Sequence, residues 1–443
     1  MGKHNIEKFS LGYRLLNFYG KFIHECLYHK YYIFNRPKRL NEAHIFVSNH
    51  QNALMDAMAI LFSSFRTVIF LARSDIFRNP KVAFWLYFLR ILPVYRIRDG
   101  FSNLKNNEEI FNTTIRVINY PRSLTMFPEG SHTHLKRLRE LQKGFARIAF
   151  QTIERNGNDK PFWIIPIGLD YENFQKYGTD LIINYGQPVN INEYYPLYCQ
   201  NPAVALNTLC DVFHDELKKL MIHIETDDWY DLTFKLININ TLQRKEKGIR
   251  HFDIFQENRK LATVISEHKS DSEKMISINN DTDQLYKILK KSKLQISELS
   301  DRKKLLKNLL ITVFLIPPIV LSMPAIIALG WFYALLKNLA NKKIKDTQFR
   351  TSVRFGALVV ISIPLILIIP LISLFFLPGI YYPILVVMLY LSGLLALKTV
   401  PRFKRYLMRL KSSILHLFGV KKIKSAIHLK TRIQSGIDDL LKK

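Results

Sequence analysis

Three long apolar stretches in the last third of the chain constrain its fold more than any other feature. They cover 309–336, 355–377 and 381–397; Pro317, Pro318 and Pro324 interrupt the first, and Pro378-Gly379 separates the other two. An apolar helix of about 20 residues spans the hydrocarbon core of a bilayer. Three such stretches in succession are more than a soluble core accounts for, so the sequence predicts an integral membrane protein.

The basic residues that flank these stretches indicate a topology. Lys and Arg are frequent over 337–355 and again from Lys398 onward. Such segments tend to remain cytoplasmic. We therefore expect the first stretch to bend at its prolines and return to the same side, and the last two to form a hairpin at Pro378-Gly379. Three plain crossings are the alternative, which places the tail opposite the segment before the first span.

The residues before the spans read as an α/β domain, in which one central sheet is flanked by helices. Short apolar runs predict strands at 43–47, 67–72, 91–95, 123–127, 163–169 and 181–185. Helices are expected after His50 and over 81–90, 106–119 and 144–155. This alternation is typical of an α/β fold.

Five regions follow from this patterning. Residues 1–40 hold apolar side chains at helical spacing, which suits either an interfacial helix or a helix packed on its own domain. Residues 41–215 are the α/β domain, 216–305 a helical extension without chemistry of its own, 306–400 the membrane spans and 401–443 a basic tail. The N-terminus lacks a signal-peptide core, so we expect the α/β domain to face the cytosol.

The charge balance calls for an anionic partner. The chain holds 64 Lys and Arg against 36 Asp and Glu, a net charge of +28. Nucleic acid and an anionic membrane both fit this number. The basic residues cluster beside apolar stretches, which favours membrane lipids, and we expect no nucleic-acid partner.

The strongest chemical signal is the segment Ser48-Asn49-His50 followed by Asp56. It lies where a predicted strand meets a predicted helix. A histidine oriented by a carboxylate is a general base suited to neutral pH. On its own such a pair is more often a helix cap and a surface carboxylate than a catalytic pair.

Three further motifs lie in the same domain. Arg96 and Arg98 follow a strand and are suited to gripping a phosphate, or they are surface charges. Phe127-Pro128-Glu129-Gly130-Ser131 forms a strand followed by a turn, in which Gly130 allows close approach of a ligand. Pro166 lies in an apolar strand, where it predicts a strand end, a bulge or an edge strand.

Other polar residues nearby give weaker signals. Lys136, Arg137, Arg139 and Lys143 read either as contacts to a phosphate-bearing donor or as a solvated helix face. His132 and His134 lack a third ligand, and the three cysteines show no metal-ligand spacing. We therefore expect no metal and no cofactor.

Four ordered motifs resemble those of the glycerol-phosphate and lysophosphatidate acyltransferase family over about residues 40–215. In chain order they are His50…Asp56, Pro93-Val94-Tyr95-Arg96, Phe127-Pro128-Glu129-Gly130 and Ile165-Pro166-Ile167-Gly168. The resemblance implies that His50 is the base, oriented by Asp56, which deprotonates a glycerol hydroxyl for direct attack on an acyl thioester. It implies a phosphate contact for Arg96, with Arg98 beside it. It places Phe127, Pro128, Glu129, Gly130, Ser131 and Pro166 in substrate binding.

Two departures from the family pattern are informative. Five residues separate His50 from Asp56, where most of the family has four; on a regular helix residues six apart lie ~240° around the axis, so the turn must be irregular or His50 must precede the helix. This spacing, the membrane spans and the segment 346–352 resemble a branch of fungal glycerol-3-phosphate acyltransferases. His132 stands where the family usually has Arg.

The expected function is phospholipid biosynthesis. A fatty acyl group would pass from acyl-CoA or acyl-carrier protein to glycerol-3-phosphate, with lysophosphatidate as the alternative acceptor. A membrane lipid-binding or scaffolding protein that keeps the fold without activity is the alternative from a different class.

Overall fold

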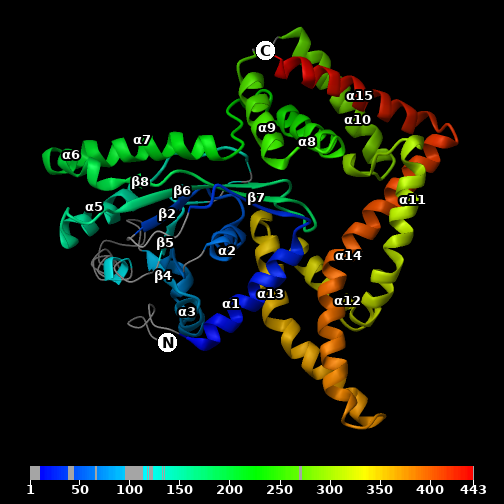
Figure 1. The fold of residues 1–443 in the computed structure, drawn as a ribbon, viewed down its shortest axis with the longest axis horizontal. Coiled ribbons are helices and arrows are strands. Elements are labelled where there is room, and N and C mark those ends of the chain that lie inside the picture. The colour runs from blue at the N-terminus through cyan, green and yellow to red at the C-terminus, as the bar shows by residue number, and fades with distance from the viewer. Residues whose placement is uncertain are drawn as a thin grey trace.

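A mixed sheet flanked by helices carries the α/β part of the molecule, as predicted (Figure 1). The computed structural model describes residues 10–37, 44–64, 67–94, 113–116, 118, 123–131, 133, 135–268 and 272–442. The strands are β1 (Tyr31–Phe34), β2 (His44–Ser48), β3 (Val68–Arg73), β4 (Ile91–Val94), β5 (Ser123–Met126), β6 (Trp163–Tyr171), β7 (Leu181–Tyr185) and β8 (Val189–Asn190). Their order is β1-β7-β6-β2-β5-β3-β4, with β8 also paired to β6.

The three central strands β6, β2 and β5 run parallel to one another. Strands β7 and β8 pair with β6 in the antiparallel sense. Because parallel strands end at the same edge, the residues that follow β2, β5 and β6 are brought together there.

Side chains alternate between the two faces of the sheet, as the two-residue period of a strand requires. Ile45 and Val47 join one apolar core with α5 (Gly144–Asn156) and α7 (Pro202–Leu220), and α6 (Tyr195–Gln200) adjoins them. Phe46, between them, faces the opposite core with α1 (Leu11–Leu27) and α2 (Ala53–Ser63). The sheet is therefore buried on both faces, which explains its nearly continuous apolar strands.

The first strand was not predicted, because residues 10–35 were assigned to one helix. Helix α1 ends at Leu27, and Tyr31–Phe34 then pairs with β7 at the edge of the sheet. The four residues Tyr-Tyr-Ile-Phe are strong β-formers.

Helix α1 combines the two interpretations that its spacing allowed. Tyr13, Ile23 and Leu27 are buried against the domain, whereas Leu15 and Phe18 are 62% and 72% exposed. The neighbouring α3 (Pro80–Phe88) likewise exposes Phe84 and Trp85, and Tyr13 contacts Phe88 between the two helices. These exposed aromatic and aliphatic groups form an apolar surface suited to a membrane interface.

Pro166 lies inside the central strand β6, whereas a strand end, a bulge or an edge strand was predicted. Its neighbour on one side is Val47 of β2. On the other side its carbonyl accepts a hydrogen bond from Gly186 N at 2.8 Å. Pro166 lies there in a gap in the pairing of β6, between the residues that pair with β7 and those that pair with β8. The N–H and C=O of a strand residue face the same side, so the N–H that proline lacks falls in this gap.

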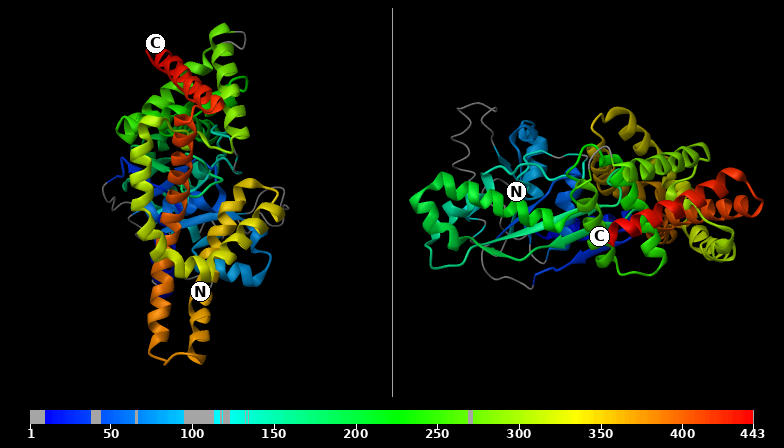
Figure 2. Two further views of the ribbon diagram at one scale, coloured as in Figure 1. Left: turned by 90° about the vertical axis from the view of Figure 1, so that its right-hand side faces the viewer. Right: turned by 90° about the horizontal axis from the view of Figure 1, so that it is seen from above.

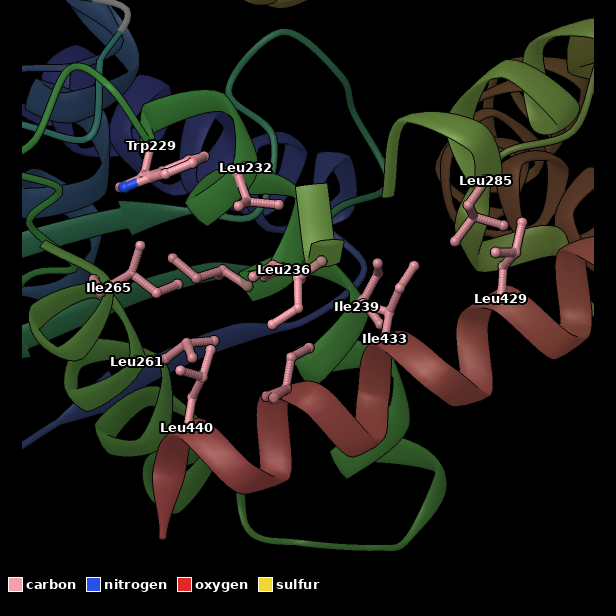
Figure 3. Close-up of a cluster of buried hydrophobic side chains, with 14 of the residues drawn as sticks. Trp229, Leu232, Leu236, Ile239, Leu261, Ile265, Leu285, Leu429, Ile433 and Leu440 are labelled. Atoms are coloured by element: carbon pink, nitrogen blue, oxygen red, sulfur yellow. The ribbon is translucent and has the colours of Figure 1, made fainter. Parts of the chain in front are cut away.

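Four further helices build a separate helical unit. They are α8 (Tyr230–Glu246), α9 (His251–Ser266), α10 (Glu273–Lys291) and the distant α15 (Lys421–Leu441). Leu429, Ile433 and Leu440 of α15 enter the same apolar core as Leu236 and Leu261 (Figure 3). The basic tail is thus helical, and its apolar side is buried.

Within the described part of the chain, three helices are long and apolar enough to cross a membrane. They are α12 (Ile316–Lys343), α13 (Thr347–Ile368, continued by a 3₁₀ segment to Phe375) and α14 (Tyr381–Leu417). Helix α11 (Leu305–Phe314) breaks from α12 just before Pro317. Helices α13 and α14 project together from the molecule and turn at Pro378-Gly379 (Figures 1 and 2).

Candidate active site

The turn between β2 and α2 brings His50 and Asp56 together. Helix α2 begins at Ala53, whose φ of +42° is unusual for a residue other than glycine, and Asn52 is its N-cap. His50 therefore precedes the helix, whereas Asp56 lies in its first turn. The irregular turn cancels the misalignment expected from their spacing, and His50 Nδ1 lies 2.8 Å from Asp56 Oδ2.

Asp56 is fully buried and surrounded by hydrogen-bond donors. The main-chain N–H groups of Gln51 and Asn52 each donate to Oδ2 at 2.7 Å. The hydroxyl of Tyr171 donates to Oδ1, also at 2.7 Å. Burial raises the pKa of Tyr171 well above its usual range, and nearby Asp56 adds to the effect, so this hydroxyl keeps its proton. These donors replace the hydrogen bonds with water that the carboxylate loses on burial.

The imidazole ring of His50 is fixed on its face as well as its edge. Phe127 stacks on it with ring centroids 4.3 Å apart and planes 17° from parallel. The ring remains 17% exposed. With Nδ1 directed to Asp56, proton transfer to a substrate falls to Nε2. The arrangement is that of a general base with a defined tautomer.

Glu129 joins the end of β5 to the same turn. It is 5% exposed, and its carboxylate accepts from the main-chain N–H of His50 at 2.7 Å and of Arg139 at 3.3 Å. Burial raises the pKa of Glu129 to about 7, although both donors favour the charged form. In this arrangement Glu129 holds the catalytic turn in place.

The other residues of the Phe-Pro-Glu-Gly turn have local roles. Gly130 takes a φ of +68°, a conformation that favours glycine, and its N–H donates to Phe127 O at 3.2 Å. Pro128 O accepts from Gln142 N at 2.8 Å. Ser131 accepts a hydrogen bond from Arg139. Substrate contacts of these residues stay predictions.

The remaining residues singled out in the sequence divide into three cases. Arg96 and Arg98 lie outside the described residues, as do His132 and His134. Pro166 is buried within β6 beside Val47. Lys136 is buried and paired with Asp170, and it also donates to Tyr171 O at 2.8 Å.

The basic segment around Lys136 was expected either to contact a phosphate-bearing donor or to form a solvated helix face, and neither interpretation holds for Lys136. Lys136 is neither at a donor surface nor on a solvated helix, because 135–143 is irregular chain that crosses the end of the sheet. Arg137 binds Ile224 O at 2.9 Å and Asp227 at 2.8 Å. The Arg137 side chain thus ties the α/β domain to the segment that leads into α8.

The sequence reasoning missed Tyr171 and the asparagines beside His50. The Asn49 side chain donates to Leu169 O at 3.0 Å and accepts from Leu169 N at 2.7 Å, which locks β2 to β6 next to the histidine. Tyr171 ends β6, the parallel neighbour of β2. A polar residue at the carboxyl end of the strand beside the histidine strand was the available signal.

Two comparisons with known proteins return acyltransferases. Residues 29–170, which contain His50, Asp56 and Glu129, match the model of the family described as Acyltransferase. Among solved structures the chain is similar to the 1-acyl-sn-glycerophosphate (LPA) acyltransferase PlsC of Thermotoga maritima. The identity is 18%, the alignment covers 46% of this chain and 79% of that chain, and the TM-score is 0.29. No curated protein matches the chain.

Proposed function

We propose that this protein is an integral membrane acyltransferase that transfers a fatty acyl group from acyl-CoA or acyl-carrier protein to a hydroxyl of glycerol-3-phosphate. The observation that carries the proposal is the hydrogen-bonded His50–Asp56 pair within a segment that matches an acyltransferase family. The reaction would supply phospholipid biosynthesis and would need neither metal nor other cofactor.

The proposed chemistry is a direct transfer. Nε2 of His50 takes the proton of the acceptor hydroxyl as its oxygen attacks the thioester carbonyl carbon. The C–S bond then breaks, and the leaving thiolate takes the proton from the imidazolium. Asp56 stabilises the imidazolium between these steps, held 2.8 Å from Nδ1. The products are an acyl ester and a free thiol.

The location of the site suits one polar and one apolar substrate. Glycerol-3-phosphate is a soluble anion, and Arg96 and Arg98 are the residues we expect to hold its phosphate. An apolar cavity of about 370 Å³ lies among α1, α12, α13 and α14 and is bordered by Tyr177. Tyr177 also bonds Thr351 O at 2.6 Å, next to the catalytic turn. Apolar space alongside α13 is compatible with a lipid substrate.

Two features favour glycerol-3-phosphate as the acceptor. They are the five residues between His50 and Asp56 and the membrane spans that follow the catalytic domain, which together resemble the glycerol-3-phosphate acyltransferase branch. Lysophosphatidate is the alternative acceptor, and a lipid-binding scaffold without activity is the alternative function.

Thiol release by the purified protein in lipid vesicles tests the proposal. A long-chain acyl-CoA or acyl-carrier protein is offered with glycerol-3-phosphate, with lysophosphatidate or with no acceptor. Release that requires glycerol-3-phosphate supports the proposal, and release only with lysophosphatidate changes the acceptor. Failure with every donor and acceptor leaves the scaffold.

The variant His50→Ala tests the mechanism. Losing a general base is expected to lower kcat about 10²- to 10⁴-fold. His214→Ala, on α7 across the sheet, is the control and keeps activity. Both proteins should fold and remain in the membrane, which thermal unfolding and vesicle flotation show. Turnover of His50→Ala at the wild-type rate would rule out the mechanism.

A further inference from the structure

We infer that Thr351, on the membrane helix α13, is a positioning residue of the catalytic centre. The inference rests on the proposed function and assigns part of the active site to a membrane span. It starts from Asn52, the residue whose N–H donates to Asp56.

Asn52 does not act as an ordinary helix cap. It is the N-cap residue of α2, yet its side chain makes no hydrogen bond to the helix, although asparagine is among the preferred capping residues. Its amide is turned elsewhere: Nδ2 donates to Phe174 O at 3.3 Å, and Oδ1 accepts from the Thr351 hydroxyl at 2.8 Å. Asn52 and Thr351 are each 1% exposed.

The turn that Asn52 supports needs external restraint. The next residue, Ala53, has a φ of +42°, and such a strained conformation persists only where its surroundings impose it. In this conformation the N–H groups of Gln51 and Asn52 reach Asp56. A bond that fixes Asn52 therefore acts on the carboxylate that orients His50.

Helix α13 is anchored at Thr351 and at two residues that follow it. Tyr177 donates to Thr351 O at 2.6 Å. One turn along, the buried Arg354 lies 4.4 Å from the centroid of the Tyr177 ring and donates to the Tyr333 hydroxyl at 2.6 Å. Ser352 also donates to Asn52 O at 3.5 Å. The first turns of this candidate span are thus fixed relative to the catalytic turn.

The consequence is that removing the Thr351 hydroxyl should affect catalysis more than substrate binding. Misplacing a catalytic group by about 1 Å costs as much as 10²-fold in rate. We expect Thr351→Val to lower kcat at least about 10-fold, with KM changed less than about twofold. Thr351→Ser keeps the hydroxyl and should restore kcat to within about threefold.

A matched control separates positioning from packing. Thr312 is a buried threonine on the apolar helix α11, where its hydroxyl bonds Asn308 O at 2.7 Å. Thr312→Val makes the same chemical change away from the site and should leave kcat unchanged. Thr351→Ala replaces Thr351→Val if the valine variant does not fold in the membrane.

A second readout needs no turnover. Diethyl pyrocarbonate modifies histidine, and peptide mapping reports His50 separately from the other histidines. At fixed pH, Thr351→Val should change the modification rate of His50 severalfold, whereas Thr312→Val and Thr351→Ser should not.

The two readouts keep failures distinguishable. If the wild type releases no thiol with any acceptor, the proposed function fails, and the modification rate still tests Thr351. Equal kcat and equal His50 modification in Thr351→Val and the wild type would overturn the inference. So would a Thr351→Ser variant as impaired as Thr351→Val.

Discussion

At the scale of single residues, the chemistry depends on where one helix begins. Asp56 could not meet His50 if both lay on a regular helix, because residues six apart face different sides. The helix begins at Ala53, and the two residues before it give their N–H groups to Asp56. One side chain thus orients the histidine and closes the turn that carries it.

Glu129 gives this turn a pH dependence. Burial raises its pKa from 4.5 to about 7, so between these values the folded protein holds a proton that the unfolded chain releases. Stability gained in this way is present at low pH and is lost as the pH rises toward 7. Glu129→Gln cannot titrate and should remove this part of the pH dependence. Thermal unfolding midpoints from pH 4.5 to 8 measure it.

Glu140, an exposed carboxylate in the same segment, provides the control for that experiment. Glu140→Gln should keep the pH dependence of the wild type. If Glu129→Gln and the wild type lose stability equally across the range, Glu129 does not hold the proton that its burial implies.

The candidate site was only partly predictable from these residues. The motif order brought His50, Asp56, Phe127 and Glu129 into one domain, and the structure places them in contact. The bonds of Glu129 to main-chain N–H groups were not predictable, because they depend on how two loops meet. Thr351 lies about 300 positions from Asn52, so no local pattern could connect them.

At the scale of elements, the strand β6 is packed with no room to spare. A Cβ added at Gly168 would lie 2.1 Å from Leu220 O, at the end of α7. The backbones of β6 and α7 therefore approach each other closely at Gly168, which has no side chain. The glycine of the Ile-Pro-Ile-Gly motif is thus explained by packing.

Gly168→Ala should consequently be strongly destabilising. Main-chain atoms of Leu220 would have to move, and overpacking of this kind costs about 3 kcal/mol. Gly144→Ala is the control, because its Cβ would meet Met126 Cε at an ordinary 3.7 Å. The thermal unfolding midpoint and the yield of folded protein measure both. Equal midpoints for the two variants would contradict the close approach.

The elements themselves were largely predictable. The short, nearly continuous apolar runs located β2 to β7 within about two residues, since burial on both faces makes such strands apolar throughout. The first strand β1 was missed, because an edge strand of four aromatic and aliphatic residues continues the composition of the preceding helix. Pro166 led to the wrong prediction for β6. A proline fits inside this central strand because its missing N–H falls in the gap between β7 and β8.

At the scale of the whole molecule, the hairpin of α13 and α14 predicts a topology. In a variant without native cysteines except Cys199, which is exposed, a single cysteine is added at 379 or at 342. We expect Cys199 and Lys342→Cys to react with a membrane-impermeant maleimide from the cytosolic side. Gly379→Cys, at the hairpin turn, should react only from the opposite side.

Each outcome of the labelling distinguishes an arrangement of the spans. Labelling of Lys342→Cys on the side opposite Cys199 would favour three plain crossings, because α11 and α12 would then not return. Labelling of Gly379→Cys and Cys199 from the same side would show that the hairpin does not cross.

The packing of α15 against α8, α9 and α10 imposes an order on the folding of the chain during its synthesis. The catalytic sheet is complete in the sequence by Asn190 and can fold while later residues are still being synthesised. The helical unit cannot, because part of its core is encoded after all three apolar helices. The apolar surface of α8, α9 and α10 that α15 covers stays exposed until the candidate spans and α15 have been synthesised. Membrane insertion thus becomes a checkpoint in the maturation of a unit that lies outside the membrane.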